Sequence, residues 1–213
     1  MAARVSDMTG HGSALSPGPG SINVLIGGMP AWRTLPAGVG AAVEAVSNAM
    51  QSFMVLPVLT PANATVQLAQ IQSGLIQAAS AAAAQGNPAA VAAASSASAL
   101  LISTNVALTA TWTVASVVPG GQPAANIAYT EGIKAVAAAA SASVFSSVAA
   151  MTDMHICPLP CPIPPHGPGM VTMGSRTVII SGLPAARQGD QVFEAAGGPD
   201  PIAMGCPTVM IGD

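Results

Sequence analysis

A short pattern occurs three times in this chain and restricts its fold more than any other feature. Each copy opens with a glycine and continues into a run in which Val and Ile stand two positions apart. Alternate side chains of a strand lie on one face, so each copy offers one apolar pair to a shared core. A unit this short cannot bury a core alone, and the repeat therefore predicts three β units packed around one axis. The three copies are residues 20–26, 174–180 and 205–211.

A second element repeats alongside the first. It reads AARVSD at residues 2–7, AARQGD at residues 185–190 and AWRT at residues 31–34. The copy at residues 31–34 stops at Thr34, and the end that it lacks is found at Thr152 and Asp153. The register predicts that residues 35–151 are an insertion into this copy. Because the uninterrupted turn is short, Thr34 and Thr152 are expected to lie close together in space.

The inserted stretch differs from its flanks in composition. Residues 35–151 are rich in Ala, Ser and Thr, whereas Gly, Pro and short β-branched runs fill the flanks. Alanine is the strongest helix former, and proline and glycine mark helix ends, so four helices are expected. Their ranges are about 37–56, 62–85, 89–118 and 124–150. The predicted fold class is α+β, in which residues 1–34 and 152–213 form a discontinuous β domain around an all-α helical insertion.

Charge is scarce, which limits the partners of the chain. Charged residues make up 6% of the sequence, against about a quarter in an ordinary soluble domain. The insertion holds three of them, Glu44, Glu131 and Lys134. Five basic residues and a net charge of −3 provide no positive surface for phosphate, which argues against a nucleic-acid partner. A chain this apolar is expected to hide much of its surface against a partner, a membrane or itself.

All histidines and cysteines lie outside the insertion, which predicts a metal site in the β domain. Imidazole and thiolate are ligands that zinc prefers, and four of them close a structural site. A catalytic zinc would keep one position open and need a general base. Asp153 and Asp190 belong to the repeat, where they are expected to brace turns, so a structural site is favoured over a small zinc hydrolase. The candidate donors are His11, His155, His166, Cys157, Cys161 and Cys206.

These repeats resemble the PAAR-repeat family. The motif itself stands as PAAR at residues 184–187, and a degenerate copy, PAWR, stands at residues 30–33. The resemblance covers residues 1–34 and 152–213. It implies a small β cone with pseudo-threefold symmetry, whose base sits on a trimeric, VgrG-like spike protein, one copy per trimer. The point of such a cone leads membrane puncture in type VI secretion and related phage-tail-like contractile injection systems.

The resemblance also implies a ligand set and a partner surface. Members of the family hold zinc with three histidines and one cysteine. By position these are His11, His155, His166 and Cys206. Cys157 and Cys161 are then expected to be buried thiols. The equivalent arginines of the three copies are expected to pair with turn carboxylates or with the spike near the base of the cone. These arginines are Arg4, Arg33 and Arg187.

The predicted function is that of a zinc-stabilised spike tip, not an enzyme. The N-terminus has no apolar signal-peptide core, so the chain is expected to assemble in the bacterial cytoplasm and to leave with the injection apparatus. The insertion has three interpretations: a soluble bundle, a membrane-active hairpin, or a docking segment for an effector or chaperone. Residues 89–118 are long enough to span a bilayer, although their hydroxyl groups lower the hydropathy. A pore-forming effector that contacts the target membrane is therefore an alternative function, beside the small zinc hydrolase.

Overall fold

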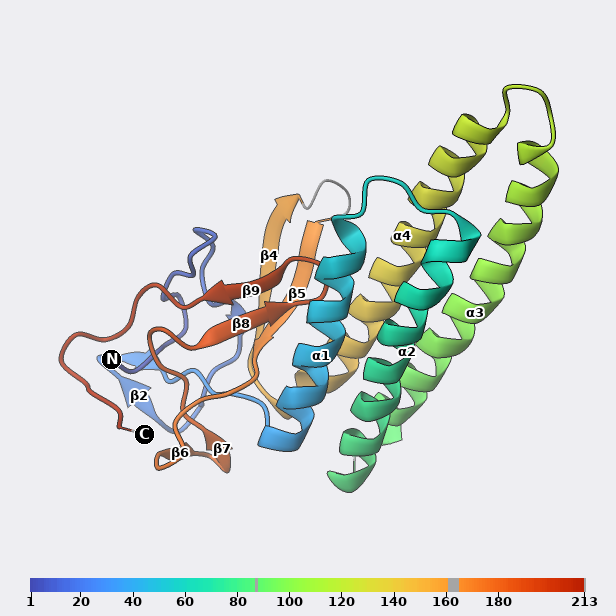
Figure 1. The fold of residues 1–213 in the computed structure, drawn as a ribbon. Coiled ribbons are helices and arrows are strands. Elements are labelled where there is room, and N and C mark those ends of the chain that lie inside the picture. Colours follow the sequence, from blue (N-terminus) through green and yellow to red (C-terminus); the bar gives the residue numbers. More distant parts are fainter. Residues whose placement is uncertain (87, 161–164, 213) are drawn as a thin grey trace.

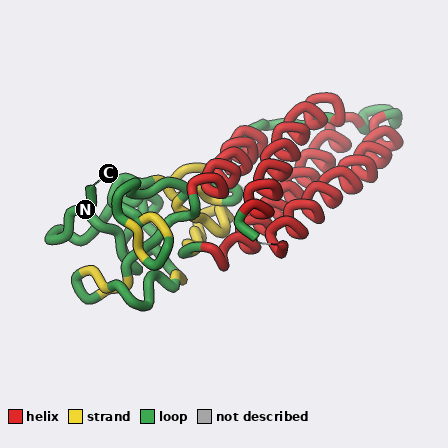
Figure 2. Tube along the Cα trace, turned by 90° about the horizontal axis from the view of Figure 1, so that it is seen from below, coloured by secondary structure: helices red, strands yellow, loops and turns green. Residues whose placement is uncertain are grey.

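The computed structural model describes residues 1–86, 88–160 and 165–212. A helical bundle and a β-rich body lie side by side in it, and both chain termini lie at the end of the β body that is farther from the bundle (Figure 1). In the view from below, the helices again lie to one side of the strands and loops (Figure 2). The fold class is α+β, as the sequence predicts.

Four helices form the bundle, and their ends follow the prolines and glycines of the sequence. Three of them, the second, third and fourth, have proline in the first turn, where its missing N–H leaves no bond unmade. At the start of the second, Asn63 Oδ1 accepts a hydrogen bond of 2.7 Å from the Thr60 N–H. The observed ends agree with the predicted ranges to within about two residues. The helices are α1 (Ala37–Met54), α2 (Pro61–Ala84), α3 (Pro88–Ser116) and α4 (Gln122–Val148), followed by the 3₁₀ turn η1 (Ala149–Met151).

Small side chains let these helices approach closely. A Cβ added at Gly74 of α2 would lie 3.0 Å from the Val46 side chain of α1. Lys134 of α4 donates a hydrogen bond of 2.7 Å to the Met54 carbonyl, which the end of α1 leaves without a helical partner. A few large side chains fill the remaining space. The largest fully buried ones in the bundle include Phe53, Tyr129, Phe145, Met50, Leu59 and Ile71.

α3 carries much of its apolar surface on the outside. Residues 91–116 are long and apolar enough to cross a membrane by length and composition, and 17% of the most apolar window is buried. One helix of this kind is weak evidence for a membrane span. Membrane contact by the insertion therefore stays a prediction, as does docking of an effector or chaperone. The exposed apolar side chains of α3 include Leu100, Ile102, Val106 and Val114.

The β body contains one five-stranded antiparallel sheet and two short ribbons. The sheet has the order β1-β4-β5-β8-β9, and the ribbons are β2–β3 and β6–β7. The two ribbons share one register, because Ile26 pairs with Met29 as Ile180 pairs with Leu183. The strands are β1 (Pro17–Gly18), β2 (Leu25–Ile26), β3 (Met29–Pro30), β4 (Met154–Pro160), β5 (Pro165–Val171), β6 (Ile179–Ile180), β7 (Leu183–Pro184), β8 (Gln191–Glu194) and β9 (Gly198–Pro201).

Three backbone segments close a ring at the centre of the β body. The N–H of Ala3 donates to the Ala186 carbonyl, that of Ala186 to Trp32, and that of Trp32 back to Ala3, each at 2.9 Å. A cyclic set of three equal bonds requires three equivalent segments around one axis. Apolar side chains beside the ring bury one another in a single cluster, to which the three copies contribute Leu15, Val171 and Ile202. The threefold repeat of the sequence is thus also threefold in space.

The repeated Val-x-Ile runs form a second layer at the end that carries the chain termini, which we call the base. Each run accepts one hydrogen bond at a valine carbonyl from an alanine N–H, and the third copy receives its bond from the N-terminal residues. The three bonds, at 2.9–3.0 Å, are Ala31 to Val24, Ala185 to Val178 and Ala2 to Val209. The N-terminal arm therefore completes the last copy of the repeat. Side chains of this layer form their own apolar cluster.

The arginine of each copy pairs with the aspartate at the end of the same turn. Arg4 pairs with Asp7 and Arg187 with Asp190, three residues apart in the chain. In the interrupted copy, Arg33 makes the same pair with a residue beyond the insertion, Asp153. Each aspartate also accepts the N–H of its arginine at 2.8 Å, so the three turns share one geometry.

The two ends of the insertion lie together at this interrupted turn. Thr152 Oγ1 donates a hydrogen bond of 3.1 Å to the Arg33 carbonyl. The Leu35 N–H donates to the Val171 carbonyl, as Ser6 donates to Leu15 in the first copy. Leu35 therefore takes part in the hydrogen bonding of the β turn, and helix α1 begins two residues after it, at Ala37, as the sequence predicts.

The bundle packs against the hairpins of the β body. Ser47 of α1 donates a hydrogen bond of 2.6 Å to the Glu194 carbonyl, and Ser141 of α4 donates one of 2.7 Å to the Ala195 carbonyl. Met170 of β5 and Ala195 are buried in the apolar core of the bundle. The turn between β8 and β9 is therefore fixed by side chains from two helices of the insertion.

Candidate metal centre

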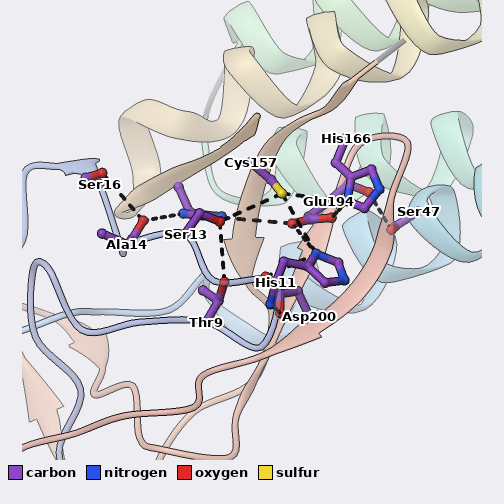
Figure 3. Close-up of polar contacts among 11 residues, drawn as sticks. Thr9, His11, Ser13, Ala14, Ser16, Ser47, Cys157, His166, Glu194 and Asp200 are labelled. Carbon is purple, nitrogen blue, oxygen red and sulfur yellow. Dashed lines mark hydrogen bonds and ion pairs between the residues drawn. The ribbon is translucent and has the colours of Figure 1, made fainter. Parts of the chain in front are cut away.

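Three hairpins extend from the central ring, away from the base, and we call the place where they meet the apex. Each follows the aspartate of one copy. The first is short and closes through a bridge between Met8 and Ala14, while the other two are β4–β5 and β8–β9. Polar side chains from all three hairpins point toward one another there (Figure 3). Residues far apart in sequence thus share one small volume.

One donor atom from each of four residues gathers at the apex, and all of these atoms lie within 4.8 Å of one another. Cys157 Sγ lies 3.8 Å from His11 Nδ1 and 3.6 Å from His166 Nδ1. Glu194 Oε1 lies 3.2 Å from His11 Nδ1, and Glu194 Oε2 lies 2.6 Å from His166 Nδ1. Cys157 and Glu194 are fully buried, whereas both histidine rings are partly exposed. An ion could therefore enter from the side of the histidines.

A second buried group adjoins the first and shares Glu194 with it. It consists of His155, Glu194 and Asp200, all fully buried. His155 Nδ1 lies 2.7 Å from the Ala14 carbonyl, so this nitrogen carries the ring proton and Nε2 carries the lone pair. Burial lowers the pKa of His155, which favours the neutral ring. His155 Nε2 lies 3.4 Å from Ser13 Oγ and 3.9 Å from Glu194 Oε1.

The apex fits a metal ion in chemistry and in spacing. Four donors at tetrahedral zinc, with bonds of about 2.0–2.3 Å, lie about 3.3–3.8 Å apart, close to most of the separations observed. Glu194 Oε2 and Asp200 Oδ2 are buried and make no well-aligned hydrogen bond, although a histidine nitrogen lies 2.6 Å and 3.3 Å from them, respectively; a cation would compensate both charges. A Cβ added at Gly197 would lie 2.2 Å from Glu194 Oε2 and 2.3 Å from the His166 ring. The backbone thus encloses the donors so closely that glycine is required there.

The Cys157 thiol must lose its proton before it can coordinate a metal. Burial raises the pKa of Cys157 to about 11, so the thiol is protonated at neutral pH. Metal binding displaces such a proton, because the thiolate is the form that coordinates. Four protein donors would close a tetrahedral site and leave no position for a substrate. The arrangement therefore suits structural metal binding.

The sequence of this region matches a known family. Residues 135–193 and 163–213 match the family model for the PAAR motif. This chain is a PAAR-repeat protein. PAAR-motif proteins are structural spike-tip proteins of type VI secretion and related contractile systems, and the family is not an enzymatic one. Searches of curated proteins and of solved structures gave no match.

The matched residues of this PAAR-repeat protein include the β4–β5 and β8–β9 hairpins and the end of α4. The N-terminal arm, which carries His11, lies outside the match. In the structure, the Ala3 segment of this arm forms one third of the central ring.

Of the four ligands expected from the PAAR resemblance, the structure does not bring Cys206 to the histidines. The Cys206 N–H donates to the Ala2 carbonyl at 2.8 Å, as Ser21 donates to Ala31 and Ser175 to Ala185 in the other copies. Cys206 thus takes the structural place of a serine in the base layer. Among the described residues, the cysteine at the apex is Cys157, for which a buried thiol without a metal role had been expected.

The remaining sequence-based candidates lie as follows. His11 and His166 belong to the first group, and His155 belongs to the adjoining one. Cys161 lies outside the described residues. The repeat arginines form pairs with turn carboxylates within the chain, the first of the two alternatives that the sequence suggested, and contact between them and a spike stays a prediction. These arginines are Arg4, Arg33 and Arg187.

Glu194 and Asp200 were not among the expected donors, because the sequence-based prediction rested on histidine and cysteine side chains alone. The register of the repeat contained a signal for Glu194. In each copy, the residue four positions after the paired aspartate lies in the apex cluster. These residues are His11, Cys157 and Glu194, which follow Asp7, Asp153 and Asp190.

Proposed function

We propose that this chain caps a trimeric spike protein of a contractile injection system. Its base sits on the spike, and the opposite end, which carries the zinc-bound apex and the helical bundle packed against it, leads. The proposed domains are the discontinuous β cone, residues 1–34 and 152–213, and the helical insertion, residues 35–151. The cone is proposed to act mechanically, as a rigid tip assembled in the bacterial cytoplasm and carried outward. The match to the PAAR motif supports the kind of protein, and the threefold base supports the kind of partner.

The observation that carries this proposal is a set of equivalent apolar side chains at the base. The middle residue of each Val-x-Ile run points to solvent, while its neighbours pack inward. These residues are Leu25, Ile179 and Met210, which are 62%, 57% and 76% exposed. Large apolar side chains exposed in threefold positions are typical of an interface, and a trimer offers the matching symmetry. The helical bundle lies at the other end of the β body and leaves this face uncovered (Figure 1).

The proposal predicts that charges at the base abolish capture by the spike. A variant with Leu25→Asp, Ile179→Asp and Met210→Asp is co-expressed with a trimeric spike protein, and co-purification is measured. The expected result is loss of the complex, because three carboxylates would be buried against the partner. Val114→Asp is the matched control, since Val114 is 71% exposed on α3, and this variant is expected to bind like the parent chain. Equal capture of the base variant and the control would refute the docking face.

Zinc is the ion proposed for the apex, because a thiolate together with imidazoles is a donor set that zinc favours. His11, Cys157 and His166 would hold it from two hairpins, and the fourth donor would come from the buried residues beside them. When bound, the ion supplies cross-links between chain segments that have little apolar core at this end. Such binding adds directly to the free energy of folding.

A further inference from the structure

We propose that Glu194 is the fourth ligand of the apex metal and that His155 is not a ligand. The inference rests on the proposed metal centre and specifies its composition: two imidazoles, one thiolate and one carboxylate. Three independent features of the structure support it, namely the register of the hairpins, the space around the donors and the balance of charge.

The hairpin register places Glu194 and Cys157 at equivalent positions. Cys157 pairs with Gly167 across β4–β5, and Glu194 pairs with Gly198 across β8–β9. Both glycines have positive φ, 78° and 79°. In the short first hairpin, His11 is followed directly by Gly12, whose φ is 76°. One donor from each copy therefore reaches the same level of the threefold body.

His166 is the additional donor, and the third hairpin leaves room for it. His166 precedes Gly167 in β5, and the residue that precedes Gly198 in the third hairpin is Gly197. A Cβ at Gly197 would lie 2.3 Å from the His166 ring, so any larger residue would displace it. Two equivalent positions thus have complementary sizes, a ring in one hairpin and a glycine in the other. The apex is thus filled by the three donors at equivalent positions, one from each copy, and by the additional imidazole of His166.

His155 lies one level closer to the central ring. It pairs with Gly169 across β4–β5, at the level where Val192 pairs with Asp200 in the third hairpin. Its Nδ1 is bonded to the Ala14 carbonyl, and its Nε2 lies within hydrogen-bond distance of a hydroxyl. Its donor atom does not belong to the group that contains the Cys157 thiol. His155 therefore acts as a positioning residue that holds the short first hairpin against β4.

The charges at the apex favour the carboxylate as a ligand. Glu194 is fully buried, and the groups that face its carboxylate are imidazoles, with His166 Nδ1 2.6 Å from Oε2 and His11 Nδ1 3.2 Å from Oε1. These rings must be neutral to bind a metal, so they cannot balance its charge in the loaded site. A buried carboxylate is costly unless a positive charge faces it directly. Coordination provides that charge, and one carboxylate with one thiolate neutralises a divalent cation. With His155 as the fourth ligand, the Glu194 carboxylate would remain buried beside the ion without a bond to it.

Zinc K-edge X-ray absorption of the zinc-loaded full chain tests the ligand count directly, because imidazole gives a distinct outer-shell scattering. The expected spectrum fits one sulfur, two imidazoles and one further oxygen. Zinc affinity is measured in parallel by chelator competition. Glu194→Gln is expected to weaken binding by more than about 100-fold, and the matched variant His155→Gln by less, within the range of about 10–100-fold found for residues outside the ligand set.

A spectrum with three imidazoles would overturn this inference and leave the proposed zinc centre intact. The reverse order of the two affinities would do the same. A parent chain that takes up no zinc would overturn the metal centre itself, and with it the assignment of Glu194. Because the spectrum is recorded on the parent chain, the ligand count does not depend on whether either variant folds.

Discussion

Cys157→Ser is expected to remove zinc from the purified chain, whereas Cys206→Ser retains about one ion per chain. Cys157 Sγ lies 3.6 and 3.8 Å from two imidazole nitrogens, while Cys206 packs in the apolar cluster of the base. Metal binding is part of the folding free energy of small metal sites. Loss of the thiolate is therefore expected to lower the free energy of unfolding by on the order of 5 kcal/mol. Elemental analysis and thermal unfolding measure the two effects.

The two variants are matched, since each exchanges one buried thiol for a hydroxyl. At position 206 the exchange recreates the residue type of the other copies, Ser21 and Ser175, so a stability change of about 1 kcal/mol or less is expected. Zinc lost from Cys206→Ser and kept by Cys157→Ser would return the thiolate to the position that the family resemblance implied.

Arg33→Ala is expected to destabilise the chain by about 3–5 kcal/mol, the range found when one partner of a buried ion pair is removed. Asp153 is fully buried, and Arg33 reaches it with two side-chain nitrogens and its own N–H, at 2.8–3.0 Å. The pair also joins the two ends of the insertion. Without it, a carboxylate stays buried where the β turn and the helical stretch meet. Urea unfolding followed by circular dichroism measures the loss.

Arg187→Ala is the control, because it removes the same type of contact from an uninterrupted turn. The Asp190 side chain is 10% exposed, and this pair closes a short local turn. Water and the backbone N–H can replace part of the hydrogen bonding that Asp190 loses, so the free energy of unfolding is expected to fall by about 1–2 kcal/mol. Equal losses in the two variants would show that the pair across the insertion has no special role in joining its ends.

Much of the fold was predictable because short sequence patterns specify its elements. Prolines and glycines set the helix ends. Of the three repeated Val-x-Ile runs, two form the short strands β2 and β6, while the third, residues 209–211, packs around the same axis without forming a strand. The two halves of the AAR-x-x-D element identified the interrupted turn, where Arg33 and Asp153 now pair as Arg4 and Asp7 do. Each of these signals lies within a few residues, or within a repeat whose copies can be aligned.

The ligand set was harder to predict, because it depends on which strand level each donor reaches. Cys206 stands at a glycine turn of the repeat, but that turn belongs to the base layer. The Cys206 N–H donates to an alanine carbonyl, as the N–H groups of Ser21 and Ser175 do in the other two copies. This equivalence is clear from the backbone hydrogen bonds but is easily overlooked in the sequence. Counting four residues from each paired aspartate would have found Cys157 and Glu194. This count identifies donors only if the three hairpins are known to start at equivalent positions after their aspartates.

We propose that both arms of the chain fold into one zinc-held body whose threefold base binds a trimeric spike. Native mass spectrometry of the full chain bound to such a spike tests it in one measurement. The predicted mass corresponds to one copy of this chain, one zinc ion and three spike subunits. A complex with several copies per trimer, or a bound chain that carries no metal, would contradict this architecture.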